Sequence, residues 1–321
     1  MIKLGNLKIK NQFMLAPMSL YSDAALIKLC YDYGCSYAFT ELLPTAAFIR
    51  KLGHLLPKID TKCNIGIQFV TNDVDELKES IRMVNEHEFY PNLKNVKSID
   101  LNLGCPKTST TKFNIGSALL NQPKIVRSLF KTMKKYSKLP VSAKIRLGIS
   151  ERHKKKKQYI DVAKIAKEEG LDFITIHGRT AQQQYTGKVD IDSIKEVAEK
   201  VDIPVVGNGN IVDIKSAGDM LSFCDAIMIG RFVVKDPFFF KQLDYWFNKK
   251  KEWKPDLNKE KLRCIKKYLS YAKKIRISQN SIRVHVQHML RGLVGQKETI
   301  RQVNKAKNIS SVLSIVKQRL P

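Results

Sequence analysis

Cys105 is the side chain in this sequence with the clearest capacity for chemistry. It follows an apolar segment and lies between Gly104 and Pro106, two residues that hold the backbone in a tight loop. A thiol in such a loop can give or take one proton. We interpret the other cysteines as small apolar core residues: Cys30, Cys35, Cys63, Cys224 and Cys264. Because no Cys-x-x-Cys pair or zinc-ligand spacing occurs, we expect no disulfide framework, no bound metal and a reducing compartment.

Lys144 indicates a bound anion. It lies within the apolar segment 141–145, where removing water from an ammonium group is costly unless a negative charge is nearby. The anionic pyrimidine edge of a reduced flavin would meet that need, and so would a structural carboxylate such as Asp100. His177 also has two interpretations. It is either a core histidine whose ring nitrogens are hydrogen-bonded within the protein, or it contacts a ligand, because Gly178 and Arg179 follow it at the end of an apolar segment.

Two glycine-containing segments predict a phosphate site. They are Gly207-Asn208-Gly209-Asn210 and Ile229-Gly230-Arg231. Glycine lets the backbone approach a ligand closely, and a guanidinium group matches the fork of a phosphate. Either segment alone is typical of a turn. Together, after the last two strands of a barrel, they favour a phosphate-bearing cofactor.

Eight short apolar segments alternate with helix-like stretches. The apolar segments span residues 13–18, 36–42, 64–70, 98–104, 141–148, 173–179, 204–211 and 226–231, and the helix-like stretches include 73–88, 158–169 and 213–223. Near-continuous apolar runs are typical of parallel strands buried on both faces. Eight strand–helix units over roughly 240 residues predict an α/β TIM (β/α)8 barrel, with a doubly wound sheet as the alternative.

Both ends of the chain add to this barrel. Residues 2–9 alternate around a Gly-Asn turn and predict a hairpin that closes the N-terminal end of the barrel. After a charged linker at 248–255, helical periodicity runs over 262–275 and 282–293, with Gly295 expected as a C-cap and Ser310 as the cap of a last segment. We therefore expect a catalytic barrel domain at 1–247 and an all-α helical bundle domain at 248–321.

Polar residues at the strand ends are the functional candidates. Reacting groups in a TIM barrel lie at the C-terminal ends of the strands, whereas the strand bodies are packing. The candidates at these ends are Pro17, Met18, Ser19, Glu41, Gln68, Asn102, Cys105, Lys144, Arg146, His177, Arg179, Asn208, Gly209, Asn210, Gly230 and Arg231. A purely structural barrel would not need all of them.

The charge and composition of the chain limit the kinds of partner that it can have. The 321 residues contain 57 Lys and Arg against 30 Asp and Glu, a net charge of +27. Residues 251–321 hold 18 basic and 4 acidic residues, so a polyanionic partner is expected there, although a lysine-rich genome would also raise the total. With 43% hydrophobic and 27% charged residues the chain is typical of a globular protein. It has no signal-peptide-like or membrane-spanning stretch, so we expect a cytoplasmic protein without membrane contact.

These residues occur in motifs that resemble those of the tRNA-dihydrouridine synthases. The most specific is Asp100-Leu-Asn-Leu-Gly-Cys-Pro106 with Gly116-Ser-Ala-Leu-Leu120 after it. Similar blocks in the same order are Ala16-Pro17-Met18, Lys144-Ile145-Arg146, Ile176-His177-Gly178-Arg179-Thr180 and Met228-Ile229-Gly230-Arg231. The resemblance covers the whole chain. Three places depart from the family. Ser19-Leu20-Tyr21-Ser22-Asp23 stands where Ala-Gly-Val-Thr-Asp is common, Phe69-Val70-Thr71 follows Gln68 where a glycine is expected nearby, and Asn210 stands where many relatives carry Asp or Gly.

The resemblance implies FMN in the barrel mouth, reduced by NADPH or NADH, and reduction of one uridine of tRNA to 5,6-dihydrouridine. Hydride from the flavin would add to uracil carbon 6, and Cys105 would give the proton to carbon 5. The residues implied for FMN are Pro17, Met18, Ser19, Gln68, Lys144, His177, Asn208, Gly209, Asn210, Gly230 and Arg231. Asn102, Arg179 and Arg146 would contact the uracil. Candidate RNA contacts are Lys107, Lys112, Arg152 and residues 154–157.

Two other functions stay open on the residues alone. Dihydroorotate dehydrogenases share several of these motifs and act on a free pyrimidine, which would not require the basic helical segment. An RNA-binding protein without chemistry would need that segment but would not need Cys105, Lys144 and His177 together. Flavin absorbance and turnover of orotate without RNA would separate the three.

Overall fold

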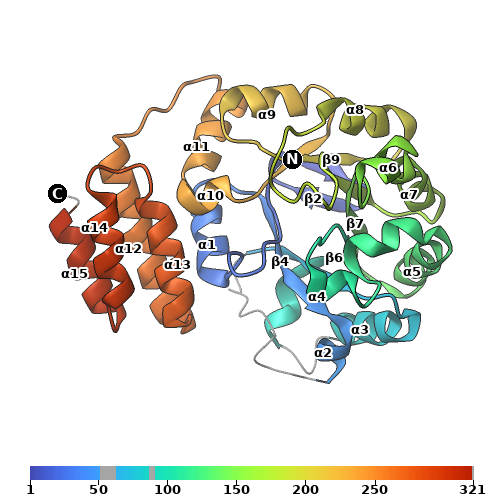
Figure 1. Ribbon diagram of the computed structural model, residues 1–321, viewed down its shortest axis with the longest axis horizontal. Helices are drawn as coiled ribbons and strands as arrows, with labels where there is room; N and C mark the ends of the chain where they lie inside the picture. The colour runs from blue at the N-terminus through green and yellow to red at the C-terminus, as the bar shows by residue number, and fades with distance from the viewer. Residues whose placement is uncertain (51–62, 87–90, 320–321) are drawn as a thin grey trace.

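The computed structural model describes residues 1–50, 63–86 and 91–319 (Figure 1). Its centre is a closed barrel of eight parallel strands in the order β10-β3-β4-β5-β6-β7-β8-β9. The strands are β3 (Phe13–Leu15), β4 (Tyr37–Pro44), β5 (Ile65–Val70), β6 (Val96–Leu103), β7 (Val141–Arg146), β8 (Phe173–His177), β9 (Val205–Asn208) and β10 (Ala226–Ile229). Each overlaps one predicted apolar segment. The TIM-barrel prediction is confirmed, and the doubly wound alternative is wrong.

The pairing register brings the polar strand ends side by side. The paired positions are Gln68 with Asp100, Asn102 with Lys144, Arg146 with His177, and His177 with Asn208. Polar side chains from five adjacent strands, β5 to β9, therefore lie next to each other at the C-terminal ends. The bodies of the same strands are almost entirely buried, as expected for a barrel covered by helices, and include the buried polar residues Ser98, Asp100 and Ser142.

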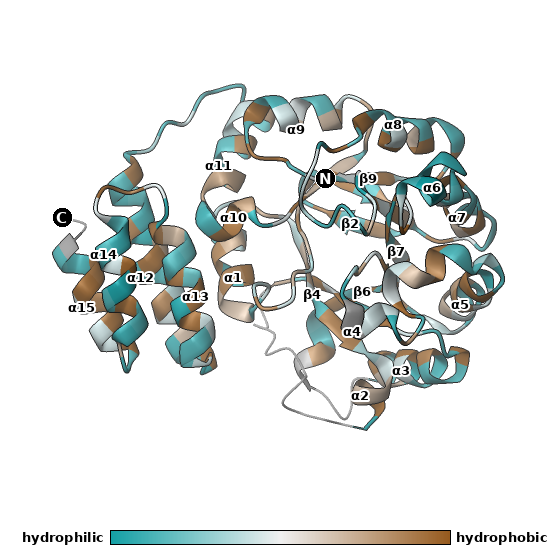
Figure 2. Ribbon diagram, viewed as in Figure 1, coloured by the Kyte–Doolittle hydropathy of each residue, from teal (hydrophilic) through white to brown (hydrophobic). Residues whose placement is uncertain are grey.

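Helices surround the barrel. They are α1 (Ala24–Asp32), α2 (Thr45–Ile49), α3 (Val74–Glu86), α4 (Thr108–Thr111), α5 (Pro123–Tyr136), α6 (Glu151–Lys155), α7 (Gln158–Glu168), α8 (Ile191–Lys200), α9 (Ile214–Leu221), α10 (Phe232–Lys235) and α11 (Phe239–Leu243), with short turns η1 (Pro91–Asn95), η2 (Gly116–Asn121) and η3 (Asp244–Asn248). Asp23, Asp190 and Asp213 each accept a hydrogen bond from a backbone N–H in the first turn of the helix that follows. Figure 2 shows hydrophobic and hydrophilic residues on separate faces of these helices.

The N-terminal hairpin closes the end of the barrel away from the polar residues. Strands β1 (Ile2–Leu4) and β2 (Leu7–Ile9) pair in antiparallel fashion. The backbone N–H and the side-chain amide of Asn6 both donate to Asp172, the residue before β8. Gly5 has a φ of +59°, and a Cβ there would lie 2.6 Å from the Asp172 carbonyl oxygen, so only glycine fits. The predicted hairpin is confirmed.

Four further helices follow residue 256: α12 (Leu257–Ile275), α13 (Gln279–Leu290), α14 (Gln296–Lys305) and α15 (Ile309–Arg319). The helical periodicity is confirmed, but two predicted caps are wrong. Gly295, with a φ of +71°, precedes α14 instead of ending α13. Ser310 lies within α15, where Asn308 accepts the hydrogen bond from the Ser311 N–H. The division into domains at 247 and 248 stays a prediction.

A buried ion pair joins these helices to the barrel. The Nζ atom of Lys261 on α12 lies 2.7 Å from a carboxylate oxygen of Asp236, which ends α10. The same ammonium group donates to the carbonyl oxygens of Met289 and Arg291, so it also caps α13. Lys261 is 1% exposed. Tertiary contacts therefore determine where α13 ends.

In the described part of the chain, no helix is long and apolar enough to cross a membrane.

Candidate active site

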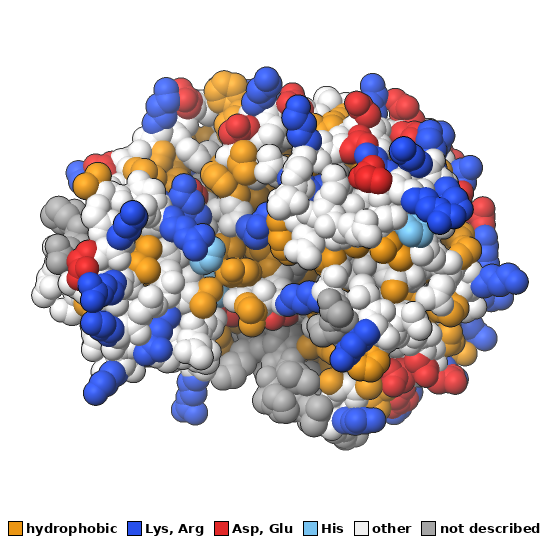
Figure 3. Space-filling view, in the orientation of Figure 1, with side chains coloured by type: hydrophobic (Ala, Val, Ile, Leu, Met, Phe, Trp, Pro, Cys, Tyr) orange, Lys and Arg blue, Asp and Glu red, His pale blue; other side chains and the backbone are white. Residues whose placement is uncertain are grey.

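A cavity of about 620 Å³ opens at the C-terminal ends of the barrel strands. Figure 3 shows it as a hollow near the middle of the visible face, with Lys and Arg side chains around it. Of the strand-end candidates, Glu41 is not among the lining residues and instead accepts a hydrogen bond from the Leu20 N–H. The others all line the cavity: Pro17, Met18, Ser19, Gln68, Asn102, Cys105, Lys144, Arg146, His177, Arg179, Asn208, Gly209, Asn210, Gly230 and Arg231. The volume is that of a typical small-molecule or cofactor site. The residues are thus together in space, and their individual roles stay predictions.

Hydrogen bonds hold the Cys105 loop from several sides. The side-chain oxygen of Asn102 accepts from the N–H groups of Gly104, at 3.1 Å, and Cys105, at 2.9 Å. Arg146 donates through Nε to the Gly104 carbonyl at 2.9 Å. The thiol sulfur of Cys105 lies 3.4 Å from the hydroxyl oxygen of Thr110. The loop is fixed through its backbone, which leaves the Cys105 side chain on the cavity wall.

A buried network of hydrogen bonds holds the side chain of Asn102 in place. Asp100 accepts hydrogen bonds from Gln68 Nε2, at 2.7 Å, and from Ser142 Oγ, at 2.6 Å. The carbonyl oxygen of the Gln68 side chain in turn accepts from the Asn102 amide at 2.8 Å. Burial raises the pKa of Asp100 to about 6, although these hydrogen bonds oppose the shift. Because the Asp100 carboxylate can only accept, it sets the orientation of both amides and thereby of the Cys105 loop.

Lys144 extends from β7 into the cavity wall and donates to the side-chain oxygen of Asn208 at 3.0 Å. Both Lys144 and Asp100 are in the described part of the chain, and no ion pair joins them there. The structural-carboxylate alternative is therefore wrong as a direct contact. Burial lowers the pKa of Lys144 to about 7, and the positive charge of Arg146 adds to this shift. An ammonium group in this position needs an anion in the cavity.

The Lys144 shift predicts a pH dependence of stability in the ligand-free protein. The unfolded chain keeps this lysine protonated up to about pH 10.5, whereas the folded chain does so only up to about pH 7. The unfolded state thus binds more protons in this interval, and the contribution of Lys144 to stability rises with pH across it. We expect Lys144→Met to remove that rise, measured as the difference in melting temperature from wild type between pH 7 and 9. Lys164→Met, at an exposed position, is the control and should follow wild type.

His177 supplies an unpartnered nitrogen. Its Nδ1 atom is buried and has no hydrogen-bond partner in the protein, although buried polar atoms are nearly always paired. Burial, together with the charges of Arg146, Lys144, Arg179 and Arg231, lowers the pKa of His177 well below its usual range. The imidazole is therefore neutral at neutral pH. A buried orphan atom on a cavity wall fits a bound ligand better than a satisfied core histidine.

The glycine segments after β9 and β10 form an open wall. Gly209 has a φ of +127°, which side chains rarely adopt, and Asn210 follows with a φ of +51°. A Cβ at Gly230 would contact only Met18 and Ala16, at 3.7 and 3.9 Å, so the space in front of it is free for a ligand. Arg231 carries a guanidinium group at the same wall, 3.7 Å from the centre of the Tyr185 ring. This wall fits a phosphate group.

The guanidinium groups of Arg179 and Arg146 donate hydrogen bonds to backbone carbonyls of nearby loops. Arg179 donates to the Gly187 carbonyl, and Arg146 donates to the carbonyl oxygens of Thr180 and Gln184 in addition to Gly104. Burial lowers the pKa of Arg146 to about 10. Both side chains line the cavity, but much of their donor capacity goes to the backbone. Their proposed contact with a substrate stays a prediction.

The cavity also has walls that the motifs did not indicate. They include Tyr21 and Tyr185 from barrel loops, Lys235 from α10, and His288 and Arg291 from α13 and its C-cap. Burial lowers the pKa of His288 to about 4, so its ring is neutral, and it packs edge-on against Tyr21 with centroids 5.2 Å apart. Only the general basic character of the C-terminal segment signalled that these helices reach the site.

The candidate RNA contacts in the loops differ in their surroundings. Lys107 lines the cavity, and Lys112 lies over the ring of Phe113. Lys154 forms an ion pair with Asp190, and Lys157 with Glu196. The charges of Lys154 and Lys157 are partly neutralised within the protein, so Lys107, Lys112 and the exposed Arg152, Lys155 and Lys156 are the better candidates. No group of three or more His, Cys, Asp or Glu side chains that could bind a metal occurs among the described residues.

Comparisons with known proteins identify related sequences. A family model described as dihydrouridine synthase matches residues 14–319. The chain is 32% identical to a probable tRNA-dihydrouridine synthase of Rickettsia prowazekii, with 84% of this chain and 81% of the relative covered. It is 29% identical to tRNA-dihydrouridine synthase B of Escherichia coli strain K12, with 77% and 75% covered.

A solved structure of a 2-naphthoyl-CoA reductase complex resembles the chain in fold alone. The TM-score is 0.53 at 11% sequence identity, with 75% of this chain and 51% of that one covered. The family model spans the barrel and the C-terminal helices, and of the described elements only the N-terminal hairpin lies outside it. The chain belongs to the dihydrouridine synthase family.

Proposed function

We propose that this protein reduces a uridine of tRNA to 5,6-dihydrouridine, with FMN as its cofactor and NADPH or NADH as the reductant. The observation that carries the proposal is one cavity that combines the Cys105 thiol with Lys144, Arg231 and the orphan Nδ1 of His177. Relatives over most of the chain are named for action on tRNA. A cationic cavity with an unpaired buried acceptor fits an anionic, planar, phosphate-bearing ligand.

The residues of this chain fit FMN in two places. Gly209, Gly230 and Arg231 would hold the phosphate, because the backbone is open at Gly230, Gly209 has a backbone conformation that side chains rarely adopt, and a guanidinium group lies beside them. Lys144 and His177 would face the isoalloxazine ring, where an anion would meet the ammonium group and a polar atom would pair with Nδ1. Pro17, Met18, Ser19, Gln68, Asn208 and Asn210 complete the proposed contacts.

Bound FMN, once reduced, would supply the hydride that adds to carbon 6 of the uracil. Carbon 5 then needs a proton, and the S–H group of Cys105 would give it, which leaves a thiolate to be reprotonated from solvent. The hydrogen bonds from Gly104 and Cys105 to Asn102 hold the thiol at the wall for this step. Asn102, Arg179 and Arg146 would position the base beside it.

The base must leave its stack to reach this cavity. Extrusion of a paired or stacked base costs a few kcal/mol, which contacts with phosphates offset. The four helices after residue 256 carry most of the 18 basic residues of the segment 251–321 and contribute His288 and Arg291 to the cavity. We infer that this segment binds the tRNA.

The test is a reaction with the purified protein, FMN, a reduced nicotinamide and an unmodified tRNA transcript. We expect dihydrouridine in the product, detected by mass spectrometry of the nucleosides, and flavin absorbance in the purified protein. Absence of dihydrouridine with a flavin-loaded protein would contradict the proposal. Turnover of orotate or dihydroorotate without RNA would favour a free-pyrimidine flavoenzyme instead.

A further inference from the structure

Leu20 has an unusual backbone conformation at the mouth of the cavity. Its φ is +75°, in the left-handed region, where a branched side chain is sterically disfavoured. Among the non-glycine residues with positive φ in the described ranges, Leu20 is the only apolar one. Its side chain is nevertheless 71% exposed, so packing against the protein does not account for the strain. Such strain at the edge of a binding site indicates a function for the residue.

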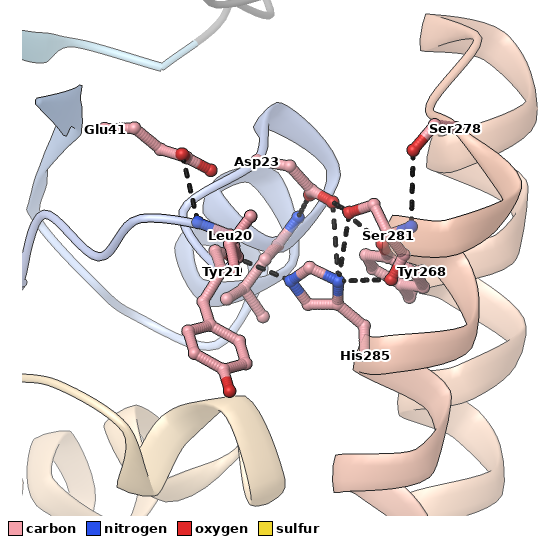
Figure 4. Close-up of polar contacts among 9 residues, drawn as sticks. Leu20, Tyr21, Asp23, Glu41, Tyr268, Ser278, Ser281 and His285 are labelled. Atoms are coloured by element: carbon pink, nitrogen blue, oxygen red, sulfur yellow. Dashed lines mark hydrogen bonds and ion pairs between the residues drawn. The ribbon is translucent and has the colours of Figure 1, made fainter. Parts of the chain in front are cut away.

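Contacts on both sides hold this conformation in place (Figure 4). The N–H of Leu20 donates to a carboxylate oxygen of Glu41 at 3.0 Å. The carbonyl of the next residue, Tyr21, accepts from Nε2 of the buried His285 on α13 at 2.8 Å. The turn itself closes through the N–H groups of Tyr21 and Ser22, which both donate to the Met18 carbonyl. The surrounding structure therefore imposes the left-handed backbone and directs Leu20 outward.

The turn that carries Leu20 is also held by contacts with the C-terminal helices. Asp23, which starts α1, accepts hydrogen bonds from Tyr268 at 2.8 Å and from Ser281 at 2.7 Å (Figure 4). His285 lies 3.5 Å from the same carboxylate. The turn that carries Leu20 is thus fixed between the barrel and α12 and α13, and it is not a free surface loop.

Leu20 belongs to a group of four exposed apolar side chains in the loops that follow barrel strands, and two of the four, Tyr185 and Val212, line the cavity. We call Leu20, Phe113, Tyr185 and Val212 the apolar rim. Each lies in a loop after a barrel strand, and they are 71%, 62%, 52% and 37% exposed. They make up half of the large exposed hydrophobic residues in the described part of the chain. Apolar groups gathered at one opening mark a binding surface.

Basic groups accompany the apolar rim. The Lys112 ammonium lies 4.9 Å from the centre of the Phe113 ring, and the Arg231 guanidinium lies 3.7 Å from that of Tyr185. A partner that offers both phosphates and apolar faces fits this mixture, and unstacked nucleotides of RNA have both. Proteins that distort nucleic acids commonly insert apolar side chains between bases.

We propose that Leu20 packs against the RNA bases beside the target uridine and fills the space that this base leaves in its stack. The proposal rests on the proposed function, since it requires that the base be extruded into the cavity. Leu20 is then a positioning residue: it stabilises the opened RNA and takes no part in the transfer of hydride or proton. Its strained backbone keeps the side chain extended before RNA arrives.

The test compares Leu20→Gly and Leu20→Asn with wild type. Glycine and asparagine both tolerate a positive φ, and asparagine also keeps a similar volume while losing the apolar surface. We expect kcat/KM for folded tRNA to fall about tenfold in both variants, mainly through KM, because a partly buried leucine contact is lost. We expect the melting temperature to be unchanged or raised. Reduction of bound flavin by nicotinamide without RNA should keep its wild-type rate.

The matched control is Trp246→Asn, at a 47% exposed apolar side chain that lies outside both the strand-end loops and the segment 251–321. It should keep the wild-type kcat/KM. Wild-type kcat/KM in both Leu20 variants would overturn the proposal. So would a lower melting temperature together with slower flavin reduction, because Leu20 would then be structural. If wild type itself forms no dihydrouridine, the proposed function fails first, and this outcome is distinct from either.

Discussion

Replacement of Cys105 by alanine is expected to lower the rate of dihydrouridine formation by about 10²–10⁴-fold, the usual contribution of a positioned general acid. The loop should keep its shape, because Asn102 holds it through the N–H groups of Gly104 and Cys105 and not through the thiol. Bound flavin and its reduction by nicotinamide should be unaffected. The measurement is single-turnover formation of dihydrouridine by flavin reduced in advance, so that only the steps on the uracil are compared.

Cys105→Ser is the conservative companion. A hydroxyl is a far weaker acid than a thiol, so the serine variant should also be slow although it nearly preserves size. Flavin absorbance and melting temperature close to wild type in both variants would show that the cavity is intact. Formation of dihydrouridine at the wild-type rate in Cys105→Ala would mean that another group gives the proton.

Replacement of Lys261 by methionine is expected to destabilise the protein by about 3–5 kcal/mol, the usual cost of removing one partner of a buried ion pair. Asp236 is 7% exposed and would keep only the more distant and more exposed Lys235 ammonium, at 3.6 Å, and the carbonyls of Met289 and Arg291 would lose a donor. Burial lowers the pKa of Lys261 while Asp236 opposes this, so the ammonium form depends on that carboxylate. The measurement is the free energy of unfolding from denaturant titration.

The exposed Lys266 on the same helix provides the control, since Lys266→Met should change stability by less than about 0.5 kcal/mol. The double variant Lys261→Met with Asp236→Asn removes the carboxylate charge as well and should recover part of the loss. A stability of Lys261→Met equal to wild type would show that the ion pair contributes nothing, and the junction would then depend on apolar packing alone.

The barrel and the location of its site were predictable from the sequence for a physical reason. Strands buried on both faces must be apolar throughout, so polar residues such as Gln68, Lys144 and His177 at their ends stand out. The direction of each side chain was not predictable. Asn102 holds the Cys105 loop and Arg146 binds three carbonyls, because the register of β6 and β7 with their neighbours decides which partners are in reach.

The helix ends and the part of the cavity wall that α13 forms could also not be predicted from the sequence. Gly295 was expected to end α13, but Lys261, far away in the chain, binds the carbonyls at that end and the helix stops earlier. His288 and Arg291 carry no local signal for the cavity, since only the docking of α13 on the barrel brings them there. The departure at Leu20 was visible as a motif difference, whereas its left-handed backbone needed the structure.

The barrel register limits how this protein can evolve. Side chains of seven strands, β4 to β10, line the cavity directly, and Ala16 does so immediately after β3. A shift of one residue in the pairing register of any strand would turn its cavity-lining side chain toward the surrounding helices. Selection would therefore remove insertions within the strands. Changes in what the cavity binds are therefore expected mainly in the loops and in the residues that α13 presents, while the barrel stays the same.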